Sequence, residues 1–420
     1  MRLAPEPSSV AVARRQVMTL LEDAGREDLV ESAVLLVSEL VTNALLHAGT
    51  DIDVTAAVDR DGLRVDIGDG SPHLPSRRRY AATAGTGRGL LMLESMVDDW
   101  GVTLHPGGKT VWFRLSGQDG ASDEPTEPRT AGTAGPGPRS SSVPVELRNM
   151  PLLLHAAWQE HAEALLREYL LASMESEGVD SIQMHAEAID AIAVLEEHVP
   201  PAPVKMSSDD LMADPTEPYV SASRIEVPVP RDSVTHFETL DRAIEAALDL
   251  SHEGLVLAAP TQPEVQVFRR WLCREVLRQA EGGSPQPWSV PADEPAVPAV
   301  PPEWDAASVV EAEGCLIAAN EASQIIAISR GAADLLGYQD GRGLVGSRIV
   351  TIIPERYRQA HVAGFTMYLL VGRKPLLDRP VKVPALRRDG TEVEIELMVR
   401  DQSAGDGRSV LIADVRAVNG

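Results

Sequence analysis

The sequence has only two cysteines, Cys273 and Cys315, among its 420 residues. Two cysteines cannot form a disulfide framework or a cysteine-rich zinc site, and so low a number is typical of a reducing compartment. The first residues lack the basic-then-apolar order of a secretion signal, and we find no apolar run that approaches the length needed to span a bilayer. We therefore expect a cytoplasmic protein without a membrane segment.

Basic residues are scarce as well, and only four of them are lysines. The chain has 38 Lys and Arg against 63 Asp and Glu, which gives a net charge of −25. Residues 116–304 hold 12 basic and 32 acidic side chains, whereas the segments on either side are nearly neutral. A surface that binds nucleic acid needs basic residues to neutralise phosphates. Nucleic acid is therefore not expected as a direct partner, and an effect on transcription would require a protein partner.

A chain of this length predicts two or three domains. Residues 118–143 and 282–304 are rich in Pro, Gly and Ser and poor in large apolar side chains, so they predict linkers. These linkers separate three regions, 1–117, 144–281 and 305–420. We expect an α+β multidomain protein with an α/β sandwich first, a mainly helical middle region, and an α/β domain last.

The middle region shows helical periodicity in four segments: 152–176, 181–198, 233–251 and 262–280. A loose stretch over 200–230 interrupts them. Four helices of this size suggest a bundle or a dimerising module. Six of the ten histidines lie in this region, but no Glu-x-x-His pair typical of a metal-carboxylate bundle occurs. We therefore expect these histidines on the surface of acidic helices.

One helix in the first region carries a polar stripe. Glu39, Asn43 and His47 are spaced i, i+4 and i+8 in an otherwise apolar segment, so they lie on one face of the predicted helix. An amide oxygen can ligate Mg²⁺ between phosphates, and a carboxylate can take a proton from an attacking hydroxyl. The stripe predicts a nucleotide site, and the alternative is a solvated helix face.

Three further features of the first region favour the nucleotide site. Asp69 and Gly70 end an alternating strand, where a buried carboxylate can accept the amine of adenine and glycine lets the ring approach the backbone. The glycine-rich segment 85–90 opens a predicted helix, whose free amides favour a phosphate. Thr110 follows a Gly-Gly turn and can complete the adenine contact. Their order within so short a stretch is more specific than any one of them.

These motifs resemble the GHKL ATPase fold, in particular the small actinobacterial anti-sigma-factor kinases. The matching segments are Ser38–Ala48, Val65–Pro72, Gly87–Leu91, Trp100–Val102 and Gly108–Phe113. The resemblance covers about residues 8–116 and implies a GHKL α/β sandwich that binds ATP and Mg²⁺.

The resemblance also implies the roles of single residues. Glu39 would be the general base for phosphoryl transfer, Asn43 the Mg²⁺ ligand, and Asp69 the residue that recognises adenine. The predicted nucleotide contacts are Asn43, Asp69, Gly70, Gly85, Gly87, Arg88, Gly89, Leu90 and Thr110. Members of this family phosphorylate a serine on an anti-anti-sigma (STAS-type) partner and sequester a sigma factor when free.

The last region resembles a PAS domain, which binds a small ligand or pairs protomers. The resemblance depends on segments 315–319, 324–328, 331–338, 344–354 and 387–393. His361 follows a Pro-Glu-Arg-Tyr-Arg segment similar to that around the iron-ligating histidine of haem-binding PAS oxygen sensors, so it is a candidate haem ligand. A structural or exposed histidine is the alternative that we favour.

The favoured hypothesis is an ATP-binding signalling regulator, a serine/threonine protein kinase of the anti-sigma-factor type. It would phosphorylate a STAS-type partner, sequester a sigma factor, or both, under the control of a PAS ligand or of homodimer formation. One alternative is a switch that binds nucleotide and a partner without phosphoryl transfer. Another is a PAS-linked, histidine-kinase-like sensor, haem-based if His361 binds iron, with His155 or His161 as its only candidate phosphate acceptors.

Overall fold

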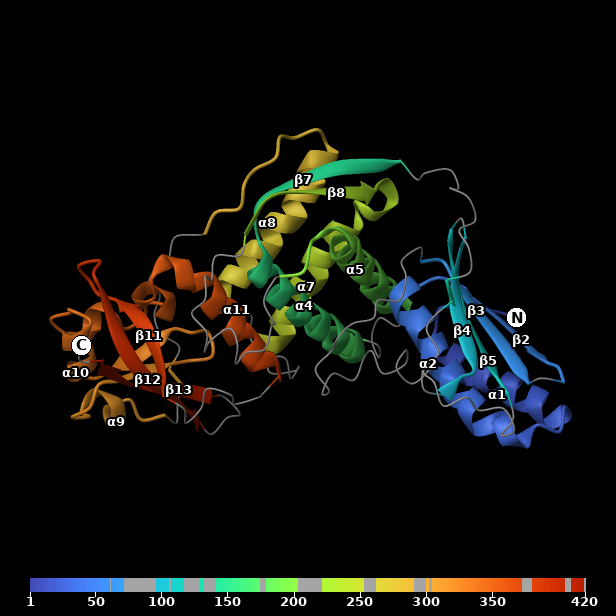
Figure 1. Cartoon of the computed structure of the whole chain (residues 1–420), viewed down its shortest axis with the longest axis horizontal. Coiled ribbons are helices and arrows are strands. Elements are labelled where there is room, and N and C mark those ends of the chain that lie inside the picture. The colour runs from blue at the N-terminus through green and yellow to red at the C-terminus, as the bar shows by residue number, and fades with distance from the viewer. Residues whose placement is uncertain are drawn as a thin grey trace. The chain divides into compact units, whose positions relative to one another are not determined.

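The computed structural model describes most of the chain, in separate segments. They are residues 1–60, 62–71, 96–105, 107–116, 129–130, 141–173, 179–202, 221–252, 262–290, 300–301, 304–371, 380–404 and 409–418. The described residues form helices and three sheets (Figure 1), so the expected α+β multidomain class is confirmed.

The chain divides into two compact units, each built from several segments. The first comprises Met1–Pro144, Tyr169–Glu197 and Pro228–Ala243. The second comprises Val145–Glu168, His198–Val227 and Ile244–Gly420. The domain boundaries expected from the sequence remain predictions.

A six-stranded sheet dominates the first unit, in the order β1-β2-β3-β5-β4-β6. Neighbouring strands are antiparallel except β4 and β6, which are parallel. The strands are β1 (Arg2–Leu3), β2 (Ile52–Val58), β3 (Leu63–Asp69), β4 (Asp99–His105), β5 (Gly108–Leu115) and β6 (Arg129–Thr130). β2 pairs with β3 and β4 with β5 as antiparallel hairpins. β6 lies inside the segment 118–143, which the composition predicts to be a linker.

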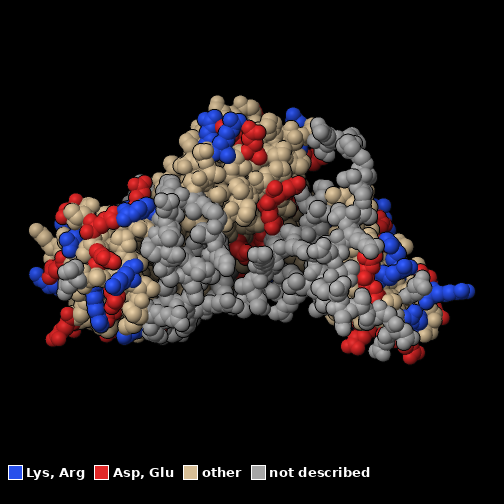
Figure 2. Space-filling model, viewed as in Figure 1, with Lys and Arg blue, Asp and Glu red and all other residues tan. Residues whose placement is uncertain are grey.

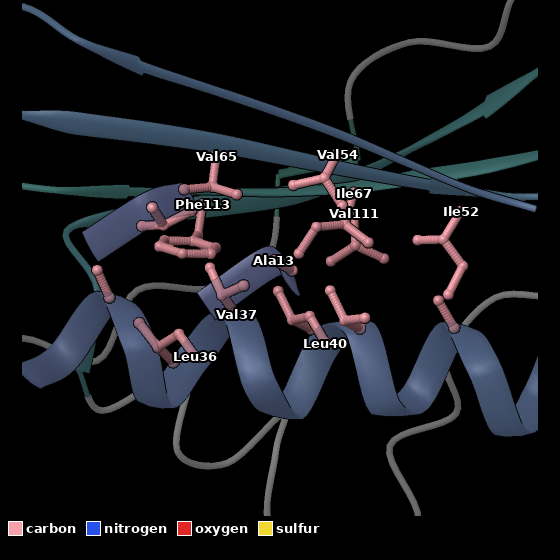
Figure 3. Packing of buried hydrophobic residues seen from close by; sticks show 14 of the residues in the cluster. Ala13, Leu36, Val37, Leu40, Ile52, Val54, Val65, Ile67, Val111 and Phe113 are labelled. Carbon is pink, nitrogen blue, oxygen red and sulfur yellow. The ribbon is translucent and has the colours of Figure 1, made fainter. Parts of the chain in front are cut away.

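Two helices pack their apolar faces on this sheet. α1 (Ser8–Asp23) is followed by a short 3-10 turn, η1 (Glu27–Leu29), and then by α2 (Val30–Ala48), which ends at Gly49 in the left-handed conformation. Figure 3 shows Leu36, Val37 and Leu40 of α2 pointing toward Val65, Ile67 and Phe113 of the sheet. α2 confirms the predicted helix that carries Glu39, Asn43 and His47.

The segment Glu27–Ala48 is long and apolar enough to cross a membrane, with a mean hydropathy of 1.7, the one such helix among the described residues. The expectation that no apolar run reaches this length was therefore wrong. The apolar side chains on one face of this helix, among them Leu36, Val37 and Leu40, belong to the buried core of the domain (Figure 3), as is common for the central helix of a small sheet domain.

The middle of the chain contains the four expected helices and a pair of strands that we did not expect. The helices are α4 (Leu152–Ser173), α5 (Val179–His198), α7 (His236–His252) and α8 (Pro263–Ala280). β7 (Ser142–Pro151) and β8 (Ser221–Pro230) form a two-stranded sheet, and a 3-10 turn, η2 (Arg231–Ser233), follows β8. Because Ile225, Val227 and Val229 alternate with polar residues and proline, β8 has a buried and an exposed face, although we expected a loose stretch there.

The histidines of this region correct a second expectation. His155, His161 and His185 are buried, at 5%, 2% and 7% exposure. His155 packs among the rings of Trp158 and Phe268. Burial lowers the pKa of His155 to about 4, so it is neutral at physiological pH. These histidines belong to the apolar faces of their helices and not to an acidic surface.

His236 is half-buried and joins α7 to α5. Its Nδ1 atom lies 2.7 Å from Asp190 Oδ2, and this hydrogen bond raises the pKa of His236 above its usual 6.5, with Glu187 and Asp232 adding negative charge. Because its pKa is higher in the folded state, protonated His236 contributes its full stabilisation below about pH 6.5. This contribution is lost as the pH rises through the folded-state pKa.

We therefore expect His236→Gln to cost about 1 kcal/mol at about pH 6 and less at about pH 8.5. Urea unfolding of both proteins at the two pH values measures the difference. An equal cost at both values would show that the charged form of His236 does not stabilise the fold.

The segment after α8 is fixed by one aromatic side chain. Trp288 is buried at 6% exposure and packs edge-on against Phe268, with Trp271 close by. Its backbone N–H donates to the carbonyl oxygen of Arg148, and Asn149 Nδ2 donates to its carbonyl oxygen. Residues 282–288, which the composition predicts to be linker, are thus held against β7.

A five-stranded antiparallel sheet forms the end of the chain, in the order β10-β9-β13-β12-β11. Its elements follow in the order α9 (Ala307–Val310), β9 (Leu316–Ala319), β10 (Ile325–Ile328), α10 (Arg330–Leu335), η3 (Gly341–Gly343), η4 (Ile349–Ile352), α11 (Glu355–Val371), β11 (Val381–Leu386), β12 (Glu392–Ser403) and β13 (Ser409–Ala417). β9 and β10 coincide with two of the segments, 315–319 and 324–328, on which the resemblance to a PAS domain depends. Ala360 and Ala363 of α11 pack against Leu153 and Ala157 of α4.

Candidate functional site

The polar stripe of α2 emerges from the apolar helix as predicted. Glu39 and Asn43 are half-buried and lie one turn apart, between positions that pack into the core. Neither side chain forms a hydrogen bond or ion pair with any described residue. His47, the third member, is exposed and has a partner of its own. Glu39 and Asn43 thus keep their carboxylate and amide oxygens available for a ligand.

The end of β3 lies beside the end of α2. The hydroxyl oxygen of Thr50, two residues after α2, accepts a hydrogen bond of 2.9 Å from the backbone N–H of Gly70. Asp69 precedes this glycine, and its side chain is only 4% exposed. The contact brings the C-terminal turn of α2 next to the predicted adenine-binding residues at the C-terminal end of β3.

Asp69 has a partner that we did not predict. Lys109 Nζ donates a hydrogen bond of 2.9 Å to Asp69 Oδ1, and the side chains are 7% and 4% exposed. The N–H of Ser71 donates to the same oxygen at 2.8 Å, and Lys109 Nζ lies 3.4 Å from the carbonyl oxygen of Ser71. The predicted adenine-binding carboxylate is therefore half of a buried ion pair.

The pairing of β3 with β5 could have indicated Lys109 in advance. Asp69 faces Lys109 in the antiparallel register, and Gly68 faces Thr110. Lys109 directly precedes Thr110 and is the one lysine of the first region, so the register of the hairpin was the available signal. Thr110 itself is half-buried, and its hydroxyl lies 3.2 Å from His105 Nε2.

Gly85, Gly87, Arg88, Gly89 and Leu90 lie outside the described residues, and their roles remain predictions.

The candidate phosphate acceptors of the histidine-kinase alternative are both buried. His155 is 5% exposed and His161 is 2% exposed. His155 packs among the rings of Trp158 and Phe268, so a phosphoryl group cannot reach its imidazole without opening that aromatic cluster. The structure therefore does not favour His155 or His161 as acceptors.

His361, the candidate haem ligand, lies in α11. Its Nε2 atom is 3.5 Å from the hydroxyl oxygen of Ser323, and its ring stacks on Phe365. Burial and the charge of Arg348 lower the pKa of His361 to about 4. Ligation of iron would have to replace the contact with Ser323, and the role of His361 in haem binding remains a prediction.

Polar side chains also join the N-terminus of α8 to the last sheet. Gln262, 1% exposed, accepts a hydrogen bond of 2.7 Å from Arg348 Nη2 and donates one of 2.7 Å to the carbonyl oxygen of Glu321. Arg348 Nη2 also lies 2.9 Å from Glu264 Oε2. This network couples α8 to the turn between β9 and β10.

We expect Gln262→Ala to destabilise this junction by about 1 to 3 kcal/mol, because buried Arg348 loses an acceptor. Native-state hydrogen exchange of the amides in α8, β9 and β10 measures the loss. Gln183→Ala, at an exposed position of α5, serves as the control. Equal exchange in the two variants would show that the network does not hold the junction.

The charged surface shows no dominant sign on the face seen in Figure 2. Described basic and acidic side chains lie next to one another on the C-terminal part of the chain in this view. Two ion pairs of this part of the chain, Arg356–Glu392 and Arg416–Asp414, join opposite charges. That nucleic acid is not a direct partner remains a prediction.

Comparison with known proteins assigns the first region to a class. A family model described as a histidine kinase-like ATPase domain matches residues 3–115. An uncharacterised protein from Azorhizobium caulinodans is 35% identical over 105 residues, which are 25% of this chain and 14% of that protein. The chain thus spans only a small part of this relative's length.

Solved structures similar to parts of this chain include several PAS domains. One from Desulfitobacterium hafniense has 16% identity and a TM-score of 0.22, and covers 26% of this chain and 94% of that chain. The PAS domain of an HTR-like protein from Haloarcula marismortui has 20% identity and a TM-score of 0.19, over 27% and 87%.

The chain therefore carries a histidine kinase-like ATPase domain at its N-terminus. Such a domain implies ATP binding, usually with Mg²⁺, and the residues present fit both. The amide oxygen of Asn43 is a hard donor suited to Mg²⁺, and Asp69 is a buried acceptor suited to the amine of adenine. The match does not extend to the subfamily of anti-sigma-factor kinases.

Proposed function

We propose that the protein is a cytoplasmic, ATP-dependent serine/threonine protein kinase of the anti-sigma-factor type. It phosphorylates a STAS-type anti-anti-sigma partner, sequesters a sigma factor, or does both. The C-terminal region, which resembles a PAS sensor in sequence, controls this activity through a small ligand or through homodimer formation.

One observation carries the proposal. Glu39 and Asn43 lie one turn apart on α2 without partners among the described residues, and α2 leads directly into Thr50, which contacts Gly70 beside Asp69. This contact supports a site in which Glu39 would be the general base, Asn43 the Mg²⁺ ligand and Asp69 the residue that recognises adenine. Phosphoryl transfer depends mainly on positioning and on charge neutralisation by Mg²⁺, with a carboxylate to accept the proton of the attacking hydroxyl.

When bound, Mg²⁺ supplies charge neutralisation at the phosphates. Asn43 would hold it through its amide oxygen. Glu39, one turn earlier, would accept the proton of the serine hydroxyl as that oxygen attacks the terminal phosphate.

The test is transfer of γ-labelled phosphate from Mg-ATP, with the full chain alone and with candidate STAS-type proteins, followed by acid treatment. Acid-stable label on a partner, absent without the kinase, is the expected result. Acid-labile label on the chain itself would support the histidine-kinase alternative. ATP binding without any transfer would leave the non-catalytic switch.

A further inference from the structure

The buried pair of Asp69 and Lys109 has two hydrogen-bonding groups that no other described residue uses. Asp69 Oδ1 accepts from both Lys109 Nζ and Ser71 N, so its second oxygen, Oδ2, is left without a described partner. An ammonium group has three donors, and among the described residues Lys109 Nζ contacts only Asp69 Oδ1 and the carbonyl oxygen of Ser71. One acceptor and one donor therefore remain side by side.

The backbone holds these groups in place. Asp69 and Lys109 face each other in the register of β3 and β5, and Gly108 lets the two strands approach closely. A Cβ atom at Gly108 would lie 1.9 Å from the carbonyl oxygen of Asp69, so no other residue fits there without moving the strands. Both side chains are shielded from water, where hydrogen bonds discriminate most strongly between ligands.

The acceptor of Asp69 and the donor of Lys109 are complementary to the hydrogen-bonding groups on one edge of adenine. The exocyclic amine of adenine is a donor, and the neighbouring ring nitrogen N1 is an acceptor. Guanine presents the reverse order at the same positions, an oxygen acceptor followed by an N–H donor. A site with Oδ2 and an ammonium N–H in fixed positions therefore pairs with adenine and opposes guanine.

We propose that Lys109 is a second base-recognition residue, which donates a hydrogen bond to N1 of adenine while Asp69 Oδ2 accepts one from the amine. Lys109 also holds Asp69 in position through Oδ1. This inference rests on the proposed ATP-binding site and adds a residue that determines its preference for adenine.

The experiment measures binding to the full chain by calorimetry, using ATP and an ATP analogue with C–H in place of N1. The wild type is expected to bind ATP about 10- to 100-fold more tightly than the analogue, the effect of one hydrogen bond from a charged donor. Lys109→Met is expected to bind the two with nearly equal affinity. Lys382→Met, which removes an exposed lysine of β11, is the matched control and should keep the wild-type ratio.

A second variant, Lys109→Gln, tests the inference if Lys109→Met does not fold. In Lys109→Gln the amide can still donate to Asp69, so the buried carboxylate keeps a partner, but the shorter side chain cannot also reach N1. It should likewise lose the preference for ATP over the analogue. Equal binding of both ligands by the wild type, or an unchanged ratio in a folded Lys109 variant, overturns the inference alone. A wild type that binds neither ligand overturns the proposed ATP-binding function as well.

Discussion

Replacing Lys109 with methionine is expected to lower the stability of the N-terminal sheet by about 3 to 5 kcal/mol. The variant leaves the carboxylate of Asp69 buried at 4% exposure with only the N–H of Ser71 as a partner. Removing one partner of a buried ion pair costs more than the pair contributes, because the remaining charge has lost both water and its counter-charge. Native-state hydrogen exchange of the amides in β3 and β5 reports this loss within the full chain.

Two further variants separate this explanation from a general loss of charge. Arg2→Met breaks the pair with Asp51, whose side chains are 69% and 47% exposed, and should cost less than about 1 kcal/mol. Lys109→Met combined with Asp69→Asn removes both charges and should be more stable than Lys109→Met alone. A cost for Lys109→Met no greater than that of Arg2→Met would contradict the buried pair.

Replacing Glu39 with alanine is expected to reduce phosphoryl transfer by about 10²- to 10⁴-fold, the usual contribution of a general base. ATP affinity should change little, because Asn43 and Asp69 remain. The variant should therefore have a lower rate of phosphoryl transfer but a nearly unchanged affinity for ATP. Single-turnover transfer of γ-labelled phosphate, with ATP affinity measured in parallel, separates the two.

Glu31→Ala provides a matched control for Glu39→Ala. Glu31 lies two turns earlier on the same helix and is exposed, so its removal should leave transfer at the wild-type rate. Transfer by Glu39→Ala at the wild-type rate would show that another group accepts the proton. A parallel fall in ATP affinity and rate would instead place Glu39 in nucleotide binding.

Periodicity made the first domain predictable from its sequence. The apolar positions of α2 recur with the helical period, and those of β3 alternate. These patterns indicate the type of each element and the face that it buries. The closing strands at the C-terminus were predictable for the same reason. The polar stripe then followed, because Glu39 and Asn43 interrupt an apolar pattern that needs no polar residue.

Features that depend on pairing between distant segments were not predictable in this way. The ion pair of Asp69 and Lys109 requires the register of β3 against β5, which local patterns do not specify. β8 contains Pro228 and Pro230, which are unusual in a strand, and its partner β7 lies far away in sequence. The buried histidines look polar in isolation, and only packing against aromatic residues such as Trp158 shows their environment.

The anchoring of Trp288 constrains the length of the chain before it. Residues 281–287 must cover a set distance between the end of α8 and Arg148 in β7, because Trp288 is held at both its ring and its backbone. Point substitutions at the exposed positions of this stretch should change the stability of the fold little. An insertion or deletion should move the indole of Trp288 away from the rings of Phe268 and Trp271. The composition of this segment is typical of a linker that tolerates changes in length, but the anchoring of Trp288 makes the segment intolerant of insertions.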